Sequence, residues 1–300
     1  MKITLSEGLK QLLMDEFLTP VNHLFNAGVV QNPNANGLHT PEARTIKNNH
    51  RNIILNQGRT DFEITADGLT PSQKIDLYCY YYFQMHFTSS YRFYFHEKDF
   101  LQASIKDKTV WFIDIGCGPF TSGLAFNSWL KNFGDLNSTQ VNYIGVDTSP
   151  NMLLKAETIS KNCKKLNYGH TTFSQDKNEI LDVPQFIAES QKELLFILNY
   201  SYLFASNSLV VQDFIDFTTE LFHFYCNRNN QITGKVVILQ QNPRLDSLNE
   251  KWAIYKAQLP MFNAKEGYPQ LLGFNFDDCL GSSNYPSPSF NVRCDLLKSF

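Results

Sequence analysis

The sequence lacks the features that mark a membrane-spanning, secreted or zinc-binding protein. No uncharged apolar run approaches the ~20 residues that a membrane-spanning helix needs. The amphipathic N-terminus carries acidic residues and lacks the apolar core of a signal peptide. The six cysteines form no C-x-x-C pair and no Cys/His cluster with zinc spacing. They are typical of free thiols in a reducing compartment, so we expect a cytoplasmic protein with no metal site and no membrane partner.

Neither sign of charge predominates. The chain has 26 Lys and Arg against 29 Asp and Glu, a net charge of −3, which excludes a globally basic surface for nucleic acid. Between residues 42 and 60, however, cations outnumber acids, with Arg44, Lys47, Arg51 and Arg59 present. We interpret this stretch as the solvated face of a helix, with a contact to phosphate or another anion as the alternative.

Aromatic residues, by contrast, are plentiful, with 25 Phe and 14 Tyr. Ten aromatic residues fall within residues 77–95, in a helix that Thr70 and Pro71 are predicted to start. Because so many aromatic side chains cannot share one helix face, the sequence predicts a helix that is buried on several sides. Its role is either core packing or an aromatic wall over a ligand, and the candidate ligand contacts are Tyr81, Tyr82 and His86.

The first 105 residues are predicted to form a helical cap or lid. Ser6 is a candidate N-cap for a helix that we expect to end near Pro20. Residues 31–41 are rich in turn-forming residues and separate this helix from the next. Residues 106–300 have a different pattern, which sets the predicted boundary between the two parts.

From residue 108 onward, short apolar strands alternate with helical segments. We predict strands at 110–115, 141–146, 171–174, 194–198 and 235–240, and helices at 121–133, 149–163, 184–190, 208–227 and 245–257. Two extended segments, 273–276 and 290–296, follow without a helix between them. This alternation predicts an α/β fold with a mostly parallel sheet covered on both faces and a terminal antiparallel hairpin.

The most informative stretch is WFIDIGCGPFTSG, residues 111–123. The predicted strand is followed by a turn in which two of three residues are glycine, and then by a helix. A strand, a glycine turn and a helix in this order present bare backbone to a nucleotide-like ligand. A dinucleotide site requires a third glycine where Thr121 stands. The shorter pattern D-x-G-x-G-P is complete, in Asp114, Gly116, Gly118 and Pro119.

With these residues the chain resembles the class I S-adenosylmethionine-dependent methyltransferases. Their first motif is an acidic residue followed by a G-x-G turn after the first strand, here Asp114, Gly116 and Gly118. Their second motif is an acidic residue at the end of the second strand, here Asp147 in YIGVDTSPNML. The resemblance covers residues 108–300. It implies a seven-stranded, doubly wound, Rossmann-like sheet, S-adenosylmethionine as the cofactor and methyl transfer as the activity.

The resemblance also implies how single residues hold the cofactor. Gly116 and Gly118 let the backbone approach it closely, with Cys117 as a small filler and Pro119 in the same turn. Asp147 accepts hydrogen bonds from the ribose hydroxyls, with capping of the next helix as the alternative role.

Further contacts are implied at the two ends of the cofactor. Asp114 anchors the amino-acid tail, and Tyr82 of the lid is placed to reach it. Thr148 and Met152 border the adenine. Asp176 binds the adenine amine, with Gln175 as a neighbouring rival and an ordinary loop acid as the alternative interpretation.

The segment after the fourth strand, which begins at Asn199, faces the transferred methyl group in that family. Methyltransferases that act on amino groups of nucleic acids often carry [DN]-P-P-[YF] here, but Tyr200 and Ser201 replace both prolines. The candidate acceptor contacts are Asn199, Tyr200, Ser201 and Tyr202. His86 is a candidate base, with a structural role as the alternative.

These observations favour a cytoplasmic enzyme that methylates a small molecule or a protein. Two alternatives stay open at this stage. An RNA methyltransferase would stack a base on the aromatic wall and meet phosphate at residues 44–59. A non-catalytic protein would use the fold only to bind the cofactor or a partner.

Overall fold

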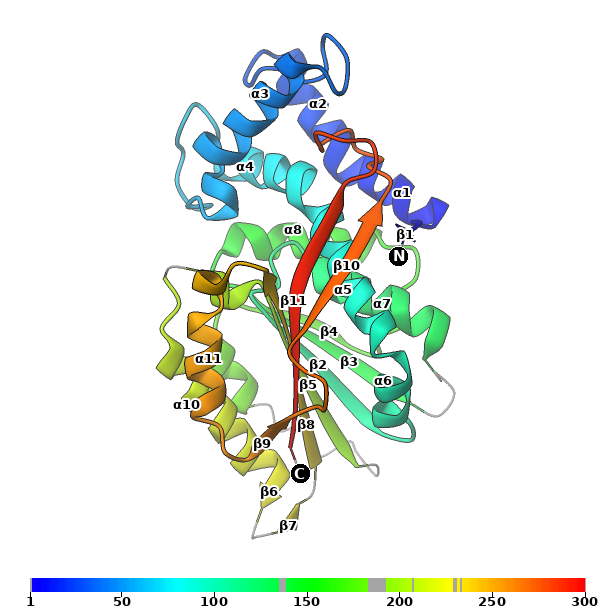
Figure 1. Cartoon of the computed structure of the whole chain (residues 1–300), viewed down its shortest axis with the longest axis vertical. Coiled ribbons are helices and arrows are strands. Elements are labelled where there is room, and N and C mark those ends of the chain that lie inside the picture. The colour runs from blue at the N-terminus through cyan, green and yellow to red at the C-terminus, as the bar shows by residue number, and fades with distance from the viewer. Residues whose placement is uncertain are drawn as a thin grey trace.

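A nine-stranded, mostly parallel sheet forms the centre of the computed structural model, with helices on both faces (Figure 1). The structure describes residues 2–134, 139–182, 193–206, 208–228, 231–232 and 234–299. The strands run in the order β1-β10-β11-β8-β5-β2-β3-β4, and β9 pairs with β11. Their bounds are β1 (Lys2–Ile3), β2 (Thr109–Ile115), β3 (Gln140–Val146), β4 (Thr171–Ser174), β5 (Leu194–Ser201), β8 (Gly234–Pro243), β9 (Phe262–Ala264), β10 (Gln270–Phe276) and β11 (Ser289–Ser299).

The direction of the strands confirms the predicted doubly wound fold. Strands β4, β3, β2, β5 and β8 lie parallel, whereas β11 runs antiparallel to both β8 and β10. The hairpin predicted from the last two extended segments is therefore present. The short β1 and β9 extend the predicted seven strands, and two or three residues are too few for a detectable period. A separate two-stranded ladder joins β6 (Asn227–Arg228) to β7 (Gln231–Ile232).

Helices cover both faces of this sheet (Figure 1). Their bounds are α1 (Glu7–Leu13), α2 (Thr19–Asn26), α3 (Pro41–Asn49), α4 (Pro71–Tyr78), α5 (Gln84–His96), α6 (Lys98–Ile105), α7 (Thr121–Phe133), α8 (Pro150–Asn162), α10 (Val211–Leu221) and α11 (Glu250–Ala257). The predicted helix at 184–190 lies outside the described residues. Within the described part of the chain, none of the helices has the length and apolar character needed to cross a membrane.

Several helices begin where the sequence predicts. The Ser149 hydroxyl accepts from the Met152 N–H at 3.1 Å at the start of α8. Thr70 and Gln73 form a reciprocal capping box at the start of α4. The helix α7 occupies the predicted residues 121–133. Local capping signals therefore agree with the starts of α8 and α4, whereas α7 begins after Phe120 without a side-chain cap.

The predicted end of the first helix near Pro20 is wrong. The helix continues through a π-helical turn, Met14–Leu18, into α2, and Pro20 lies in the first turn of α2. Proline lacks the N–H that would bond to the Glu16 carbonyl oxygen four residues earlier. The Lys155 ammonium donates to that oxygen at 2.8 Å instead. A distant side chain thus replaces the missing donor and lets the helix continue.

The interpretation of residues 42–60 as a solvated helix face is wrong for its central cations. Lys47 is fully buried, and its ammonium donates to the carbonyl oxygens of Leu38 and Ser283 at 2.8 and 2.7 Å. Arg51 donates to the Ser282 carbonyl oxygen at 2.6 Å. The loop between β10 and β11 supplies the oxygens of Ser282 and Ser283. Both cations therefore join the N-terminal helices to the terminal hairpin, two regions that lie together in Figure 1.

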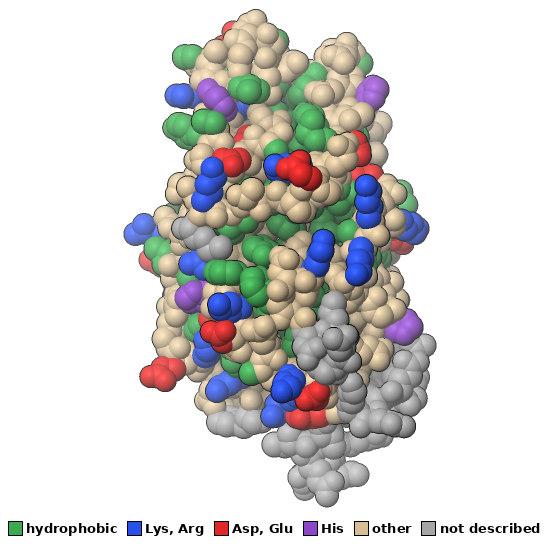
Figure 2. Space-filling model, turned by 90° about the vertical axis from the view of Figure 1, so that its right-hand side faces the viewer, with side chains coloured by type: hydrophobic (Ala, Val, Ile, Leu, Met, Phe, Trp, Pro, Cys, Tyr) green, Lys and Arg blue, Asp and Glu red, His purple; other side chains and the backbone are tan. Residues whose placement is uncertain are grey.

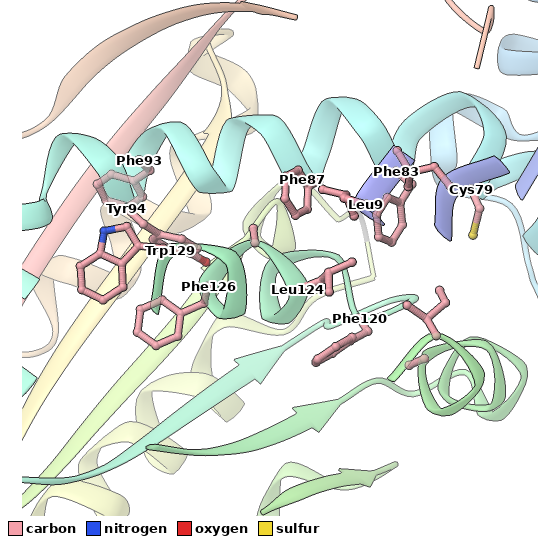
Figure 3. Packing of buried hydrophobic residues seen from close by; sticks show 14 of the residues in the cluster. Leu9, Cys79, Phe83, Phe87, Phe93, Tyr94, Phe120, Leu124, Phe126 and Trp129 are labelled. Atoms are coloured by element: carbon pink, nitrogen blue, oxygen red, sulfur yellow. The ribbon is translucent and has the colours of Figure 1, made fainter. Parts of the chain in front are cut away.

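Aromatic side chains fill the space between α5, α7 and β2 (Figure 3). The Tyr94 ring meets the Phe126 ring edge-on at 5.3 Å, and Phe126 stacks on Phe112 at 4.3 Å. Such contacts add to the hydrophobic free energy of burial. The predicted burial of the aromatic helix is confirmed, because one apolar cluster joins the N-terminal helices to the sheet. The boundary near residue 105 stays a prediction.

Replacing Gly123 in α7 with Ala should destabilise the fold. A Cβ at this position would lie 2.4 Å from ring atoms of both Phe120 and Tyr143. Displacing rings in a packed core costs about 1–3 kcal/mol, which urea denaturation would detect as a lower free energy of unfolding. The matched control is Gly8→Ala in α1, where an added Cβ has nothing within 4 Å. It should stabilise the protein by up to about 1 kcal/mol, and equal effects of the two changes would contradict this packing.

Candidate functional site

The glycine turn follows β2 directly and is held by backbone hydrogen bonds to β3. The N–H groups of Gly116 and Cys117 donate to the Val146 carbonyl oxygen at 2.8 and 3.0 Å. Gly116 and Gly118 have φ values of +73° and +51°, which glycine adopts without strain. A Cβ at Gly116 would meet the Leu203 side chain at 3.1 Å, whereas one at Gly118 would meet nothing within 4 Å. The backbone at Gly118 is therefore open to a ligand.

Asp147 lies beside this turn, at the carboxyl end of β3. Its Oδ2 accepts from the Gly118 N–H at 2.9 Å, and its Oδ1 accepts from the Ser149 N–H at 3.0 Å. Burial raises the pKa of this carboxyl, while the two N–H donors oppose the rise. A carboxylate has about four acceptor sites, so both oxygens keep capacity for further donors. Asp147 thus supports the start of α8 and also remains available to a ligand.

A cavity of about 820 Å³ opens above these two features, at the carboxyl ends of β2, β3, β5 and β8. Ligands of open α/β sheets bind at this edge. The sheet side of the cavity is lined by Gly116, Cys117, Gly118, Pro119, Asp147, Ser201 and Tyr202, among others. The lid side is lined by residues 56–60 with Tyr78, Tyr82, Met85 and His86, and a third side by Pro243, Leu245, Ser247 and Leu248.

A ladder of aromatic rings forms part of the lid side. The Tyr82 and His86 rings lie 5.9 Å apart at an interplanar angle of 26°, and the His86 and Tyr202 rings lie 4.2 Å apart at 23°. Tyr82 belongs to a π-helical turn, Cys79–Phe83, that joins α4 to α5. Turns of this kind are frequent at functional sites. The ladder brings together residues of the lid and of the sheet.

His86 is uncharged at neutral pH, because burial lowers its pKa to about 4. Its Nδ1 lies 3.5 Å from the Tyr78 hydroxyl, and the Tyr202 hydroxyl pairs with Ser89 Oγ at 2.8 Å. Tyr202 has a φ of +62°, a left-handed conformation that is uncommon for a residue other than glycine. Such strain is concentrated at functional sites. Tyr202 lines the cavity, which agrees with that tendency.

Asp114 and Asn199 lie beneath the turn rather than in the cavity. The Asp114 carboxylate accepts from Asn199 Nδ2 at 2.7 Å and from the Tyr143 hydroxyl at 3.0 Å. The Asn199 Oδ1 accepts in turn from the Tyr94 and Ser201 hydroxyls, at 3.2 and 3.0 Å. Both residues are about 1% exposed. Their polar groups are thus used within the protein, and their predicted ligand contacts stay untested predictions.

Other predicted residues also lie away from the cavity lining. Tyr200 is fully buried on the opposite face of the sheet, where its hydroxyl pairs with Thr218 Oγ1 at 3.0 Å. Tyr81 is buried, and its hydroxyl pairs with His50 at 2.8 Å. Asp176 is exposed, and its carboxylate accepts from the Asn178 N–H. The cavity lining also excludes Thr148, which is exposed, Met152, which is buried, and Gln175, which is exposed.

Sequence reasoning missed several of the lining residues. Residues 56–58, with the sequence Asn-Gln-Gly, border the cavity, and a turn signal of this kind is visible in the sequence. The loop after β8 does so with Leu245, Ser247 and Leu248, and only its place at the end of a parallel strand indicated a ligand contact. Tyr78 and Met85 gave no signal apart from their membership of the aromatic helix.

No protein family and no curated protein matches the chain. Several solved structures are similar to it at low sequence identity. A candidate class I S-adenosylmethionine-dependent methyltransferase from Listeria monocytogenes is 11% identical, with a TM-score of 0.41, and the match covers 98% of this chain and 88% of that chain. A candidate RNA methyltransferase from Pyrococcus horikoshii is 9% identical, with a TM-score of 0.38 and coverages of 71% and 84%. An S-adenosylmethionine-dependent methyltransferase from Agrobacterium tumefaciens is 9% identical, with a TM-score of 0.32 and coverages of 69% and 61%.

Ionisation of Asp114 should make the stability of the fold depend on pH. Burial raises the pKa of this carboxyl from 3.8 to about 7. At a pH between these two pKa values, the Asp114 carboxyl therefore keeps its proton in the folded state but has lost it in the unfolded state. The stabilisation of the folded state by this bound proton is fully present below pH 3.8 and disappears as the pH rises through 7. It amounts to up to about 4 kcal/mol.

The variant Asp114→Asn keeps the shape of the side chain but has no charge to bury. Its free energy of unfolding, relative to that of the wild type, should therefore be higher at pH 8 than at pH 4. Urea denaturation across this range measures the difference. Asp176→Asn, at an exposed carboxyl, is the control and should follow the wild type. A constant difference between Asp114→Asn and the wild type would contradict this role for Asp114.

Proposed function

We propose that this chain transfers the methyl group of S-adenosylmethionine to a small-molecule acceptor. The observation that carries the proposal is the meeting of an open glycine turn and a ligand-accessible carboxylate, Gly118 and Asp147, in one cavity. The cavity lies where an α/β sheet binds nucleotide-like ligands. Its volume of about 820 Å³ lies near the top of the range of about 300–1,000 Å³ for small-molecule sites. That volume favours a cofactor together with a small acceptor.

The residues at the sheet side fit the cofactor. Gly116 and Gly118 allow its close approach to the backbone, and Asp147 has free acceptor capacity for two ribose hydroxyls. When bound, S-adenosylmethionine supplies a methyl group on a positively charged sulfur. The protein then has to align the acceptor with that group and exclude water. Residues of the lid and of the loops after β5 and β8 enclose the space in which this alignment takes place.

The aromatic ladder suits a cationic sulfur. Tyrosine faces attract cations, with an interaction of about 0.5–2 kcal/mol. An uncharged His86 adds no positive charge that would repel the sulfonium. The same low pKa makes its imidazole a weak base, which disfavours the predicted role of His86 as a catalytic base. We therefore assign His86 to the wall of the site, where its ring positions Tyr202.

The acceptor side of the cavity favours a small molecule over RNA. It combines the hydroxyls of Ser201, Ser206 and Ser247 with the apolar side chains of Leu245 and Leu248. Hydroxyl groups fix the orientation of a small ligand, while apolar groups supply most of its buried area. On the part of the described surface seen in Figure 2, Lys and Arg alternate with Asp and Glu and form no continuous basic patch. RNA binding draws on such a patch for its affinity.

Binding of S-adenosylmethionine tests the proposal directly. Isothermal titration calorimetry should detect the cofactor on the wild type, and Asp147→Ala should weaken it about tenfold to hundredfold. The expected loss is that of hydrogen bonds to a charged group, about 1.5–3 kcal/mol. Methyl transfer to pools of small metabolites, followed with a radiolabelled methyl group, then identifies the acceptor.

Asp213→Ala is the matched control for that measurement. It removes an exposed carboxylate in the first turn of α10 that lies outside the cavity lining. Its affinity for the cofactor should equal that of the wild type, and a loss equal to that of Asp147→Ala would contradict the position assigned to the ribose. Absence of binding to the wild type at millimolar cofactor would contradict the proposed function as a whole.

A further inference from the structure

Arg59 stands out because it brings a charge to the cavity from a strained segment. Asn56, Gln57 and Gly58, just before it, have φ values of +44°, +56° and +85°. Two of these three residues carry side chains, for which the left-handed conformation is unfavourable. All three border the cavity together with Arg59. The segment therefore keeps an unfavourable backbone conformation at the place where Arg59 meets the ligand space.

Local contacts hold this segment in place. The N–H groups of Gly58, Arg59 and Thr60 all donate to the Leu55 carbonyl oxygen, at 2.7, 3.0 and 3.2 Å. A Cβ at Gly58 would lie 3.2 Å from the Tyr78 ring, so only glycine fits there without displacement. The turn is thus packed against the aromatic wall of the cavity.

The chain after Arg59 is anchored next to Asp147. The Glu63 carboxylate accepts from the Asn151 side-chain amide at 2.5 Å and from the Ser149 hydroxyl at 2.5 Å, both at the start of α8. Lys74 of α4 donates to the Asp61 carbonyl oxygen at 3.0 Å. The position of Arg59 over the cavity is therefore fixed from both sides of the segment.

The charges around the cavity are few and opposite. Among the described residues that line it, Arg59 is the one Lys or Arg and Asp147 the one Asp or Glu. The guanidinium donates to the Gln57 side-chain oxygen at 3.1 Å, and none of the ion pairs found among the described residues includes it. Most of its five donors are therefore available to an anion.

The cofactor of the proposed function carries one negative group, the α-carboxylate of its amino-acid tail. Asp147 repels that group, and Asp114, which the sequence suggested for the tail, is buried below the turn and is itself an acid. We propose that Arg59 binds the α-carboxylate of the cofactor, which places the tail under residues 56–60 and the ribose at Asp147. A planar guanidinium matches a carboxylate with two parallel hydrogen bonds. This assignment rests on the proposed function.

Two analogues of the cofactor that lack the methyl group and differ only in the carboxylate test the assignment. S-adenosylhomocysteine carries it, and S-adenosyl-3-thiopropylamine lacks it. Calorimetry on the wild type should show about tenfold to hundredfold tighter binding of the first, which is the range for hydrogen bonds to a charged group. Arg59→Gln should remove most of this preference and leave the affinity for S-adenosyl-3-thiopropylamine unchanged. Arg59→Lys keeps the positive charge but lacks the planar guanidinium with its two parallel donors, so it should give an intermediate preference.

Arg44→Gln is the matched control, because Arg44 is an exposed arginine that lies 5.3 Å from the Tyr285 ring and outside the cavity lining. It removes the same charge and should keep the full preference. A wild-type preference that survives in Arg59→Gln, or equal binding of the two analogues by the wild type, overturns the role of Arg59 and leaves the proposed function intact. A wild type that binds neither analogue nor S-adenosylmethionine overturns both. Thermal unfolding of each variant should match that of the wild type, because both arginines are exposed.

Discussion

The hydrogen bond from the Gly118 N–H to the Asp147 carboxylate is the contact on which the site depends. It ties the turn after β2 to the end of β3, and the Val146 carbonyl oxygen adds two further bonds from the same turn. Because the sheet is parallel here, the two strand ends lie side by side and point their loops the same way. This contact thus orients the acid beside the turn, and a second one, from the Ser149 N–H to Asp147 Oδ1, supports the start of α8.

The N-terminal helices share one apolar core with the sheet. Aromatic rings of α5 pack on α7 and β2, and the cations Lys47 and Arg51 join the N-terminal helices to the β10–β11 loop. The Glu63 contacts with the start of α8 complete this attachment. The cavity is therefore held between two walls that are joined by packing and hydrogen bonds, and such contacts limit the conformational entropy lost on binding.

Few charged side chains line this cavity among the described residues. The acid Asp114 is kept below the turn in hydrogen bonds to Asn199 and Tyr143, and burial raises its pKa to about 7. His86 is held neutral by its surroundings. Among the described residues that line the cavity, Asp147 is therefore the one charged acid and Arg59 the one cation. A pair of opposite charges in one cavity orients a ligand that carries a matching pair of polar ends.

The sequence by itself determined most strands of the sheet, several helices and the turn. Strand periodicity, the Ser149 cap and the two glycines are local signals, so α7, β4 and the open backbone at Gly118 were predicted from short stretches. Only the tertiary structure decided which polar groups face the ligand. Asn199 lies below the turn because Asp114 and Tyr94 meet it there, and Arg59 borders the cavity because distant helices carry its segment across. Contacts between residues far apart in the chain depend on how the elements pack, and no local pattern encodes them.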